Sequence, residues 1–311
     1  MTRRGTRRSD SAVGGIYAFI AYLLWGMFPL YFTTLLPAGP WEIVAWRVLL
    51  ALVFCVIALS VMRGWRAFGR IVRRPRLLGW TAVAGVLIFL NWTVYLLAVL
   101  TGHVIEASLG YFINPIVTVL LGVLVLHERL RLAQWIAIGV AVAAVVVIVV
   151  GYGQVPWIAL GLAFSFGLYG LAKNRVGPSV DALSGLTLET AWLAPVAAGM
   201  LVWVSATGAV TVGGYGAGHA VLLSLAGVVT AIPLLFFAAA TRRAPLSLVG
   251  LLQFLTPILQ FLTGVVLFHE DMSLERWIGF ALVWVALVVL TADSLRHARR
   301  GRGVEDVAEI V

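Results

Sequence analysis

The sequence has 311 residues, of which 62% are hydrophobic and 11% are charged. Soluble domains are about half apolar and about a quarter charged, so this composition and a mean hydropathy of +1.03 exclude a water-soluble enzyme and a disordered chain. They also exclude a nucleic-acid-binding domain, and the formal net charge of +9 is instead expected to set the orientation of the chain in a membrane. With Cys55 as its one cysteine, the sequence has no disulfide framework and no cysteine-based metal site.

Apolar segments separated by proline, glycine and charged residues predict an all-α membrane protein with ten transmembrane helices. A span needs about 20 largely apolar residues to cross a hydrocarbon core of roughly 30 Å. Solid apolar runs such as Val140–Val150 do not alternate as the strands of a membrane barrel do. In chain order the predicted spans are 13–35, 41–62, 77–100, 105–126, 132–150, 156–173, 181–205, 218–240, 246–268 and 274–293.

Basic residues gather at alternate turns between these spans, and this indicates the orientation of the chain. With the N-terminus inside, all but two of the 22 Lys and Arg residues fall on the cytoplasmic side. The two exceptions are Arg276 in an outer turn and Arg47 inside a span. The cytoplasmic residues lie at 3–8, 63–76, 129–131, 173–175, 242–243 and 296–302.

The opening arginines also resemble the basic region of a secretory or twin-arginine signal. The apolar run that follows, 13–34, is as long as a full span and shows no small-x-small cleavage pattern. We therefore expect this run to remain as the first span, preceded by a basic cytoplasmic N-terminus at 1–12.

An internal repeat relates the two halves of the sequence. Pro115 matches Pro257, His127-Glu128 matches His269-Glu270, and Trp135 matches Trp277, so equivalent positions lie 142 residues apart. Because each half holds five spans, an odd number, the second copy enters the membrane from the opposite side. Inverted repeats have two near-equivalent arrangements, which underlie alternating access in secondary transporters. The alternative is that duplication built a stable bundle that transports nothing.

Several motifs in this register resemble one group of transporters. The most specific is Glu106–Pro115 (EASLGYFINP), which is followed by His127-Glu128-Arg129. Supporting stretches are Tyr22–Gly26, Trp46–Val48, Ala159–Phe166 and Glu189–Trp192. From residue 14 to residue 295 the sequence resembles the EamA-domain transporters of the drug/metabolite transporter superfamily, and within it the RarD-like branch. One departure is His127, where relatives often have a glycine before the glutamate.

The resemblance implies a bacterial inner-membrane permease with two five-helix EamA repeats around a central cavity. It also implies export of metabolites or amphipathic compounds, and RarD-like proteins are commonly described as chloramphenicol-sensitivity permeases. We therefore expect 13–150 to be the first EamA repeat and 156–293 the second, inverted one. A cytoplasmic C-terminal tail is expected at 294–311.

Arg47 and Glu189 are repeat mates and are the two charges inside the predicted spans that are best placed to matter. Burying either one costs several kcal/mol unless it is paired or hydrated. By the rise per residue, Arg47 lies about 9 Å below the outer face and Glu189 about 12 Å above the inner one. They either line a cavity, where they bind a polar substrate or exchange a proton, or form a buried ion pair that fixes the repeats together.

Polar residues at helical spacing mark two further spans. In 105–126 the stripe is Glu106, Gly110, Asn114 and Thr118, and in 246–268 it is Gln253, Thr256 and Gln260. Pro115 and Pro257 each free a backbone carbonyl, and we predict them as hinges in cavity-lining helices. The alternative is that the stripes only bond neighbouring helices and that the prolines kink their helices for packing.

Aromatic and amide side chains complete the predicted cavity wall. They can present flat faces to a ring-bearing or cationic substrate, although most aromatic residues in such a protein anchor it at the interface or fill its core. The candidates are Trp25, Asn91, Tyr95, Tyr111 and Tyr169, with Tyr22 and Trp92 beside them. Two repeat mates, Gly85 and Gly227, are expected to let helices approach closely.

The sequence predicts no enzyme, no cofactor and no metal site. His127-Glu128 and His269-Glu270 lack the second histidine, four residues on, of a metalloprotease helix, and we expect them to cap span ends as charged turns. No nucleotide-binding P-loop is present, so energy is expected from an ion gradient or from substrate exchange.

Together these features predict an alternating-access carrier in a bacterial cytoplasmic membrane that exports a small polar or amphipathic metabolite. Its expected partners are a small-molecule substrate and membrane lipid, and it is not expected to bind nucleic acid. A non-transporting scaffold or receptor, or a lipid scramblase, is the alternative. The sequence leaves open the identity of the substrate, the formation of a homodimer, and coupling to a proton or another ion.

Overall fold

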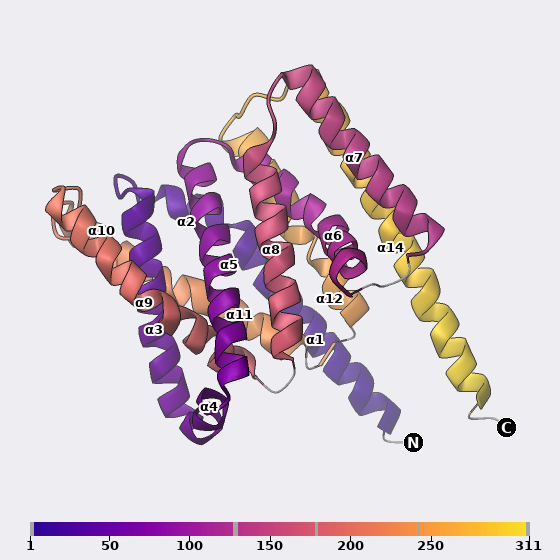
Figure 1. Ribbon diagram of the computed structural model, residues 1–311, viewed down its shortest axis with the longest axis horizontal. Helices are drawn as coiled ribbons and strands as arrows, with labels where there is room; N and C mark the ends of the chain where they lie inside the picture. The colour runs from indigo at the N-terminus through magenta and orange to yellow at the C-terminus, as the bar shows by residue number, and fades with distance from the viewer. Residues whose placement is uncertain (1–2, 127–129, 178–179, 242, 245, 309–311) are drawn as a thin grey trace.

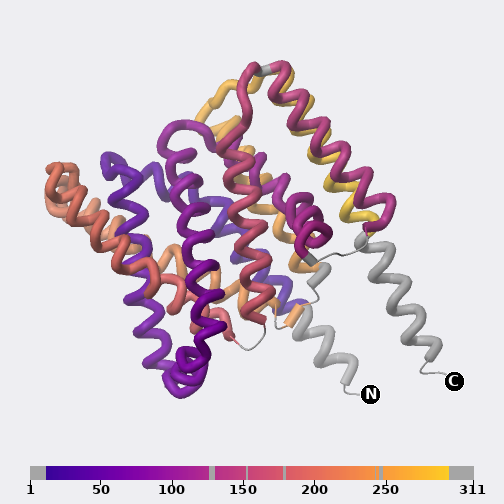
Figure 2. The backbone as a smooth tube through the Cα atoms, viewed as in Figure 1, coloured from indigo at the N-terminus to yellow at the C-terminus, as the bar shows by residue number. Residues whose placement is uncertain are grey.

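The computed structural model describes residues 3–126, 130–177, 180–241, 243–244 and 246–308, so His127-Glu128-Arg129, Arg242 and the outermost residues of both predicted tails lie outside it. Within these ranges the chain forms fourteen α-helices and one π-helix, η1, and no strand (Figures 1 and 2). In order they are α1 (Arg3–Gly26), α2 (Phe28–Thr33), α3 (Pro40–Val61), α4 (Trp65–Val72), α5 (Pro75–Leu100), α6 (Val104–Leu126), α7 (Leu132–Tyr152), α8 (Trp157–Val176), α9 (Ala182–Ala206), α10 (Gly216–Ser224), α11 (Ala226–Thr241), α12 (Leu246–Leu252), α13 (Leu255–Leu262), η1 (Thr263–Leu267) and α14 (Leu274–Ala308).

Nine segments of the described chain are long and apolar enough to cross a membrane. They correspond to nine of the ten predicted spans. The remaining predicted span, 156–173, is α8, which packs along α5 and α6 and carries the polar residues Lys173-Asn174-Arg175 near its C-terminal end. The protein is therefore a multi-pass, all-α membrane protein with nine or ten spans.

Three predicted spans are each made of more than one helix, where the sequence predicts one helix for each span. The first, 13–35, turns at Met27, and Pro29 follows in the first turn of α2, where a missing N–H costs nothing. The ninth, 246–268, restarts at α13 with Pro257 in its first turn. The eighth, 218–240, is interrupted only at Leu225.

Two regions expected to be turn or tail are helical. α4 forms within the arginine-rich turn at 63–76, where Ile71 is buried and Arg70 is exposed. α14 continues to Ala308, through the region expected as a tail from residue 294. We call the end of the bundle that carries α4 the arginine end, and the opposite end, with the α5–α6 and α7–α8 turns, the Glu270 end (Figure 1).

Equivalent helices of the two repeats pack against each other and make equivalent contacts. α3 packs on its repeat mate α9, and α7 packs on its repeat mate α14. α5 packs on α8 and α9, and its mate α11 packs in the same way on α1 and α3. In Figure 1, α3 descends toward α4 whereas α9 leads up toward α10, so these mates run in opposite directions. The two repeats are therefore inverted.

Two glycines show this equivalence in detail. A Cβ on Gly85 of α5 would lie 3.1 Å from the carbonyl oxygen of Glu189 in α9, and a Cβ on Gly227 of α11 would overlap the backbone of Leu50 in α3. Both glycines therefore let one repeat touch the backbone of the other, as the sequence predicts. The contacts lie beside Glu189 and within one turn of Arg47, so they fix the helices that carry these two residues.

Candidate substrate site

Arg47 of α3 is buried inside the bundle, with 3% of its surface exposed, and side chains of both repeats enclose it. Its Nε donates to the hydroxyl of Thr230 in α11 at 2.9 Å. Its guanidinium carbon lies 4.3 Å from the centre of the Trp92 ring and 5.5 and 5.3 Å from the rings of Phe28 and Phe32. Nη1 is buried and has no hydrogen-bond partner among the described residues. The site thus holds a cation with an unused donor.

A hydrogen-bonded set of side chains, which we call the central network, joins α5, α6, α8 and α13. Asn91 donates to the Ser165 hydroxyl at 3.0 Å and accepts from the Tyr111 hydroxyl at 3.2 Å. Gln260 Nε2 donates to the Tyr95 hydroxyl at 3.1 Å. The rings of Tyr95 and Tyr111 lie 5.8 Å apart, so the two hydrogen-bonded groups form one cluster.

The central network extends to Arg47 on one side and to α1 on the other. The Phe32 ring lies 6.2 Å from the Tyr95 ring and 5.3 Å from the Arg47 guanidinium carbon. Gln260 Nε2 also contacts the carbonyl of Trp25 at 3.2 Å, while its Oε1 is buried without a partner in the described structure. Six of the predicted residues therefore come together: Trp25, Arg47, Asn91, Tyr95, Tyr111 and Gln260.

Glu189 lies in a second site on α9, with 1% of its surface exposed. Its Oε1 accepts from Lys173 Nζ at 2.7 Å, and its Oε2 accepts from the Tyr169 hydroxyl at 3.1 Å. The Phe166 ring lies 5.8 Å from the Tyr169 ring and 6.2 Å from the Tyr111 ring. Aromatic side chains therefore connect the Glu189 site to the central network.

The two repeat mates Arg47 and Glu189 do not pair with each other. The ion pairs of the described residues are Lys173–Glu189 and Arg131–Asp293, and Arg47 takes part in neither. The interpretation that an Arg47–Glu189 pair fixes the two repeats is therefore not supported. Their roles in binding stay a prediction.

The polar stripe of α6 faces α8. Glu106 Oε1 accepts from the N–H of Ile158 at 3.0 Å and of Ala159 at 3.4 Å, at the start of α8. A Cβ on Gly110 would lie 2.7 Å from the Ala159 carbonyl oxygen, and Asn114 Oδ1 is buried without a partner in the described structure. Glu106 and Gly110 therefore hold α6 against α8, and Glu106 lies outside the central network.

The two predicted hinge prolines have different surroundings. α6 runs through Pro115 without a break, whereas the break between α12 and α13 includes Gln253 and lies just before Pro257. The predicted stripe is therefore divided between the break and α13, on which Thr256 donates to the Tyr22 carbonyl at 2.8 Å. A hinge role stays a prediction for both prolines.

Glu270 joins the repeats at the end of the bundle that bears its name. It accepts from the N–H of Val104 at 2.6 Å and of Ile105 at 2.9 Å, where α6 begins. Glu270, of the predicted His269-Glu270 turn, therefore caps a span end. Burial raises the pKa of Glu270 above its ordinary value, although the hydrogen bonds from Ile105 and Val104 lower it.

Two more carboxylates bind backbone N–H groups across the repeats at the same end. Glu106 binds the start of α8, as described above. Glu42 of α3 accepts from the N–H of Thr211 at 3.0 Å and from its hydroxyl at 2.9 Å, and this hydroxyl also contacts His219. We call the contacts of Glu42, Glu106 and Glu270 the three clasps, because each joins one repeat to the other.

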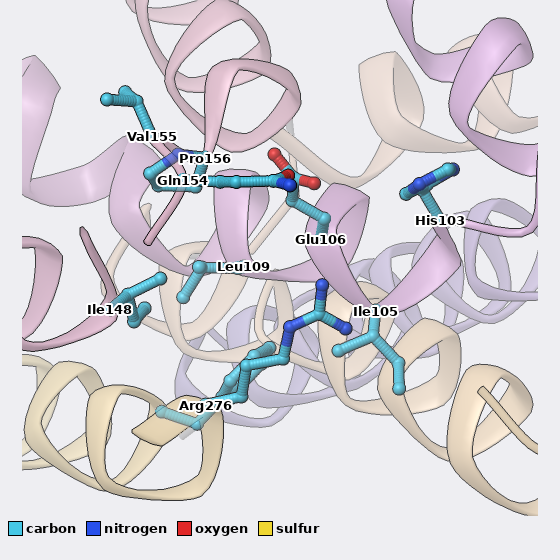
Figure 3. A pocket seen from close by; sticks show the side chains of 10 residues that line it. His103, Ile105, Glu106, Leu109, Ile148, Gln154, Val155, Pro156 and Arg276 are labelled. Carbon is cyan, nitrogen blue, oxygen red and sulfur yellow. The ribbon is translucent and has the colours of Figure 1, made fainter. Parts of the chain in front are cut away.

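A small pocket of about 70 Å³ lies beside the Glu106 and Glu270 clasps (Figure 3). Glu106, Gln154 and Arg276 extend toward it from α6, from the α7–α8 turn and from α14. Ligand pockets usually measure about 300–1,000 Å³, so this one is too small for an organic substrate. The central network, where both repeats and six predicted residues meet, is the better candidate.

Comparison with known proteins identifies the group to which this architecture belongs. A family model described as the EamA-like transporter family matches residues 12–150. Protein RarD of Streptomyces exfoliatus is 49% identical over 94% of this chain and 93% of its own length. The uncharacterized transporter YojE of Bacillus subtilis is 39% identical over 95% of this chain and 99% of its own length. The chain belongs to the EamA-like transporter family.

Within that family it is RarD-like, and it is a membrane transporter, as the family description and the name of the YojE relative indicate. One solved crystal structure is 21% identical, superposes with a TM-score of 0.53, and covers 90% of this chain and 97% of that one. At this identity the likeness supports the fold alone.

Sequence reasoning about this EamA-like transporter missed several polar residues of the sites, among them Ser165, Lys173, Glu42 and Thr230. Lys173 was counted only as an orientation signal, although its place near the end of a span, 16 residues before Glu189, could have suggested a partner. Glu42 was a detectable carboxylate at the start of an apolar span. Thr230 gave no signal, because a single threonine in an apolar helix usually bonds its own backbone, as Thr230 also does with Ala226.

Proposed function

We propose that this protein is a secondary carrier that moves a small polar or amphipathic molecule across the membrane by alternating access, through the central network. The observation that carries the proposal is the inverted packing of two repeats around a buried polar and aromatic cluster to which both contribute. Two inverted copies can exchange conformations, and this opens the cluster first to one side and then to the other.

The three clasps are proposed to form the gate at the Glu270 end. Each carboxylate accepts from backbone N–H groups of the opposite repeat, so relative movement of the repeats must break these bonds. A hydrogen bond to a charged group contributes about 1.5–3 kcal/mol, and three such contacts can hold a closed state that a substrate or ion still releases. The structure with all three clasps formed would then be the state that is closed at this end.

The arginine end is proposed to face the cytoplasm of a bacterial inner membrane. The exposed Arg70 of α4 and the other arginines of the turn at 63–76 support this orientation through the positive-inside rule. Reporter fusions after Arg63 and after Lys173 should both report the cytoplasm. Reporters on opposite faces would contradict the orientation and the inverted arrangement together.

Transport is tested by reconstitution of the purified protein into liposomes. We expect flux of at least one class from a panel of amino acids, nucleosides, organic acids and amphenicols under an imposed pH or ion gradient. A protein that moves none of these solutes but scrambles labelled lipid would support the scramblase alternative. A folded protein that moves neither would support a scaffold or receptor.

The gate is tested with cysteines in a Cys55→Ser background. We expect a short, reducible bifunctional thiol reagent to cross-link the double variant Val104→Cys/Glu270→Cys and to abolish flux, and a reductant to restore it. Each single cysteine variant, treated in the same way, is the matched control. Full flux through the cross-linked double variant would show that the Glu270 end does not have to open.

A further inference from the structure

We propose that Arg47 binds the carboxylate group of an organic substrate whose body is apolar and carries a ring. This inference rests on the proposed carrier function, because it names the class of molecule that occupies the central network. It is carried by a buried cation that has, among the residues that the structure describes, an unused donor, no anionic partner and aromatic walls.

The guanidinium of Arg47 is held in place but is not saturated. Its Nε donates to the Thr230 hydroxyl at 2.9 Å, and the Trp92 ring lies 4.3 Å from the guanidinium carbon. Nη1 is buried without a partner within the described chain. The planar fork of arginine suits a carboxylate, and an N–H that no protein group uses is available for a ligand.

The protein neutralises the equivalent buried charge of the other repeat but not this one. Lys173, 16 residues before Glu189, binds it at 2.7 Å. The residue at the same separation before Arg47 is Tyr31, a neutral side chain whose hydroxyl donates to the Leu222 carbonyl at 2.8 Å. Arg47 therefore lacks the counter-charge that its repeat mate has.

A buried cation without an anion is unfavourable in a low dielectric, and the rare charges inside membrane spans usually mark a functional site. An anionic ligand that enters the site would supply the missing charge. It would exchange part of its own hydration for a charge-assisted hydrogen bond and for attraction in a medium that screens weakly. A neutral amide analogue would keep a hydrogen bond from the guanidinium but lose the attraction between opposite charges, and a cationic analogue would gain neither.

The walls around Arg47 indicate the rest of the ligand. The rings of Phe28, Phe32 and Trp92 surround the guanidinium, and the Tyr95 ring stands behind Phe32. Rings in such positions favour flat or apolar bodies through offset and edge contacts. Gln260 Oε1, buried without a partner in the described structure, offers an acceptor from the second repeat to a hydroxyl or amide of the ligand.

Binding is tested on the purified protein in detergent with probes that differ only in charge. The probes are benzoate, phenylacetate, indole-3-acetate and octanoate, each paired with its neutral amide, and phenethylamine serves as the cation. We expect at least one carboxylate to raise the melting temperature and to bind at least tenfold more tightly than its amide, as one charge-assisted hydrogen bond implies.

The variant Arg47→Gln should lose this preference, with carboxylate affinity falling roughly ten- to hundredfold and amide affinity changing little. Arg47→Lys keeps the positive charge without the planar guanidinium, and its carboxylate affinity should lie between those of the native protein and Arg47→Gln. Arg70→Gln, which removes an exposed arginine of α4, is the matched control and should bind as the native protein does. Without ligand, Arg47→Gln should melt within a few degrees of the native protein, whereas a purely structural arginine would make it melt much lower.

Carboxylates that bind no better than their amides, or whose preference survives in Arg47→Gln, would overturn the inference. The inference would also be overturned if the unliganded Arg47→Gln protein were much less stable than the native protein, if Arg47→Lys restored full stability, and if neither substitution changed carboxylate binding. Arg47-dependent carboxylate binding in a protein that moves no solute would instead leave this inference intact and overturn the carrier proposal.

Discussion

Arg47 and Glu189 stand at equivalent positions in the two repeats and lie in opposite electrostatic surroundings. Glu189 has a lysine ammonium at 2.7 Å and a tyrosine hydroxyl at 3.1 Å. Arg47 has one hydroxyl, three rings and an unused donor. Of these two repeat mates, only the charge in the second repeat has an oppositely charged partner among the described residues, so the two charges should respond differently when they or their partners are changed.

The largest expected effect is that of Lys173→Met, which leaves Glu189 buried without its cation. Removing one member of a buried pair typically costs 3–5 kcal/mol, and because the Lys173 side chain is 32% exposed we expect about 3 kcal/mol. Thermal unfolding of the purified protein measures this, with Lys173→Arg as the control that keeps the charge. Unchanged stability in Lys173→Met would remove the contrast between the repeats.

A smaller effect is expected for Glu189→Gln. Lys173 then loses its partner but can reach water, so we expect a loss of about 1–2 kcal/mol. Thermal unfolding of Glu189→Gln and Lys173→Met, measured side by side, sharpens the comparison because it gives the stability lost when each member of the ion pair is removed. If Glu189→Gln were the more damaging of the two variants, the carboxylate would have a role beyond the pair.

The helices that carry the two charges also begin differently, and this gives a third test. α9 starts at Asp181, whose side chain accepts from the Ser184 N–H at 3.0 Å, whereas α3 starts after Gly39 without a side-chain cap. Asp181→Ala should cost about 1 kcal/mol. Asp181→Asn, which can still cap, is the control.

The Asp181 cap should also make stability depend on pH. Desolvation raises the pKa of Asp181, but the hydrogen bonds from Ser184 and its neighbours outweigh it, so the net pKa is lowered. A lowered pKa contributes stability that is present above the ordinary aspartate value of about 3.9 and is lost as pH falls through the folded value. Melting curves from pH 7 to pH 3 should therefore show the gap between native protein and Asp181→Ala closing below about pH 4.

The smallest expected change in stability is that of Arg47→Gln without ligand. The hydrogen bond to Thr230 is lost, but the burial of an unpaired charge is relieved, so the net change should be within about 1 kcal/mol. A loss of about 3 kcal/mol or more, comparable to that in Lys173→Met, would place Arg47 in the architecture and end the contrast.

The sequence predicted the repeat, its inversion and most of the central network because these depend on register. Once Pro115 and Pro257 are aligned, the helices that carry Arg47, Asn91 and Gln260 follow from span order alone. The rotation of each helix about its axis does not follow, and it decides which side chains meet. Lys173 was therefore not recognised as the partner of Glu189.

Glu106 is a second residue whose surroundings could not be predicted from the sequence. Its spacing along α6 placed it with Asn114 in a predicted cavity wall, and the α6–α8 contact instead directs it to the first N–H groups of α8. A helix start in another segment of the chain determines this, so no local pattern reveals it. Likewise, no local pattern distinguishes Pro29 and Pro257, which follow breaks, from Pro115, which lies inside an unbroken helix.

The clasps have a consequence for how this protein can evolve. Their acceptors are side chains, but most of their donors are main-chain N–H groups, those of Val104, Ile105, Ile158 and Thr211 among them. Every amino acid except proline supplies such a donor. The facing segments can therefore drift almost freely in sequence while the closure persists, provided that three glutamates stay in place and no proline arrives opposite them.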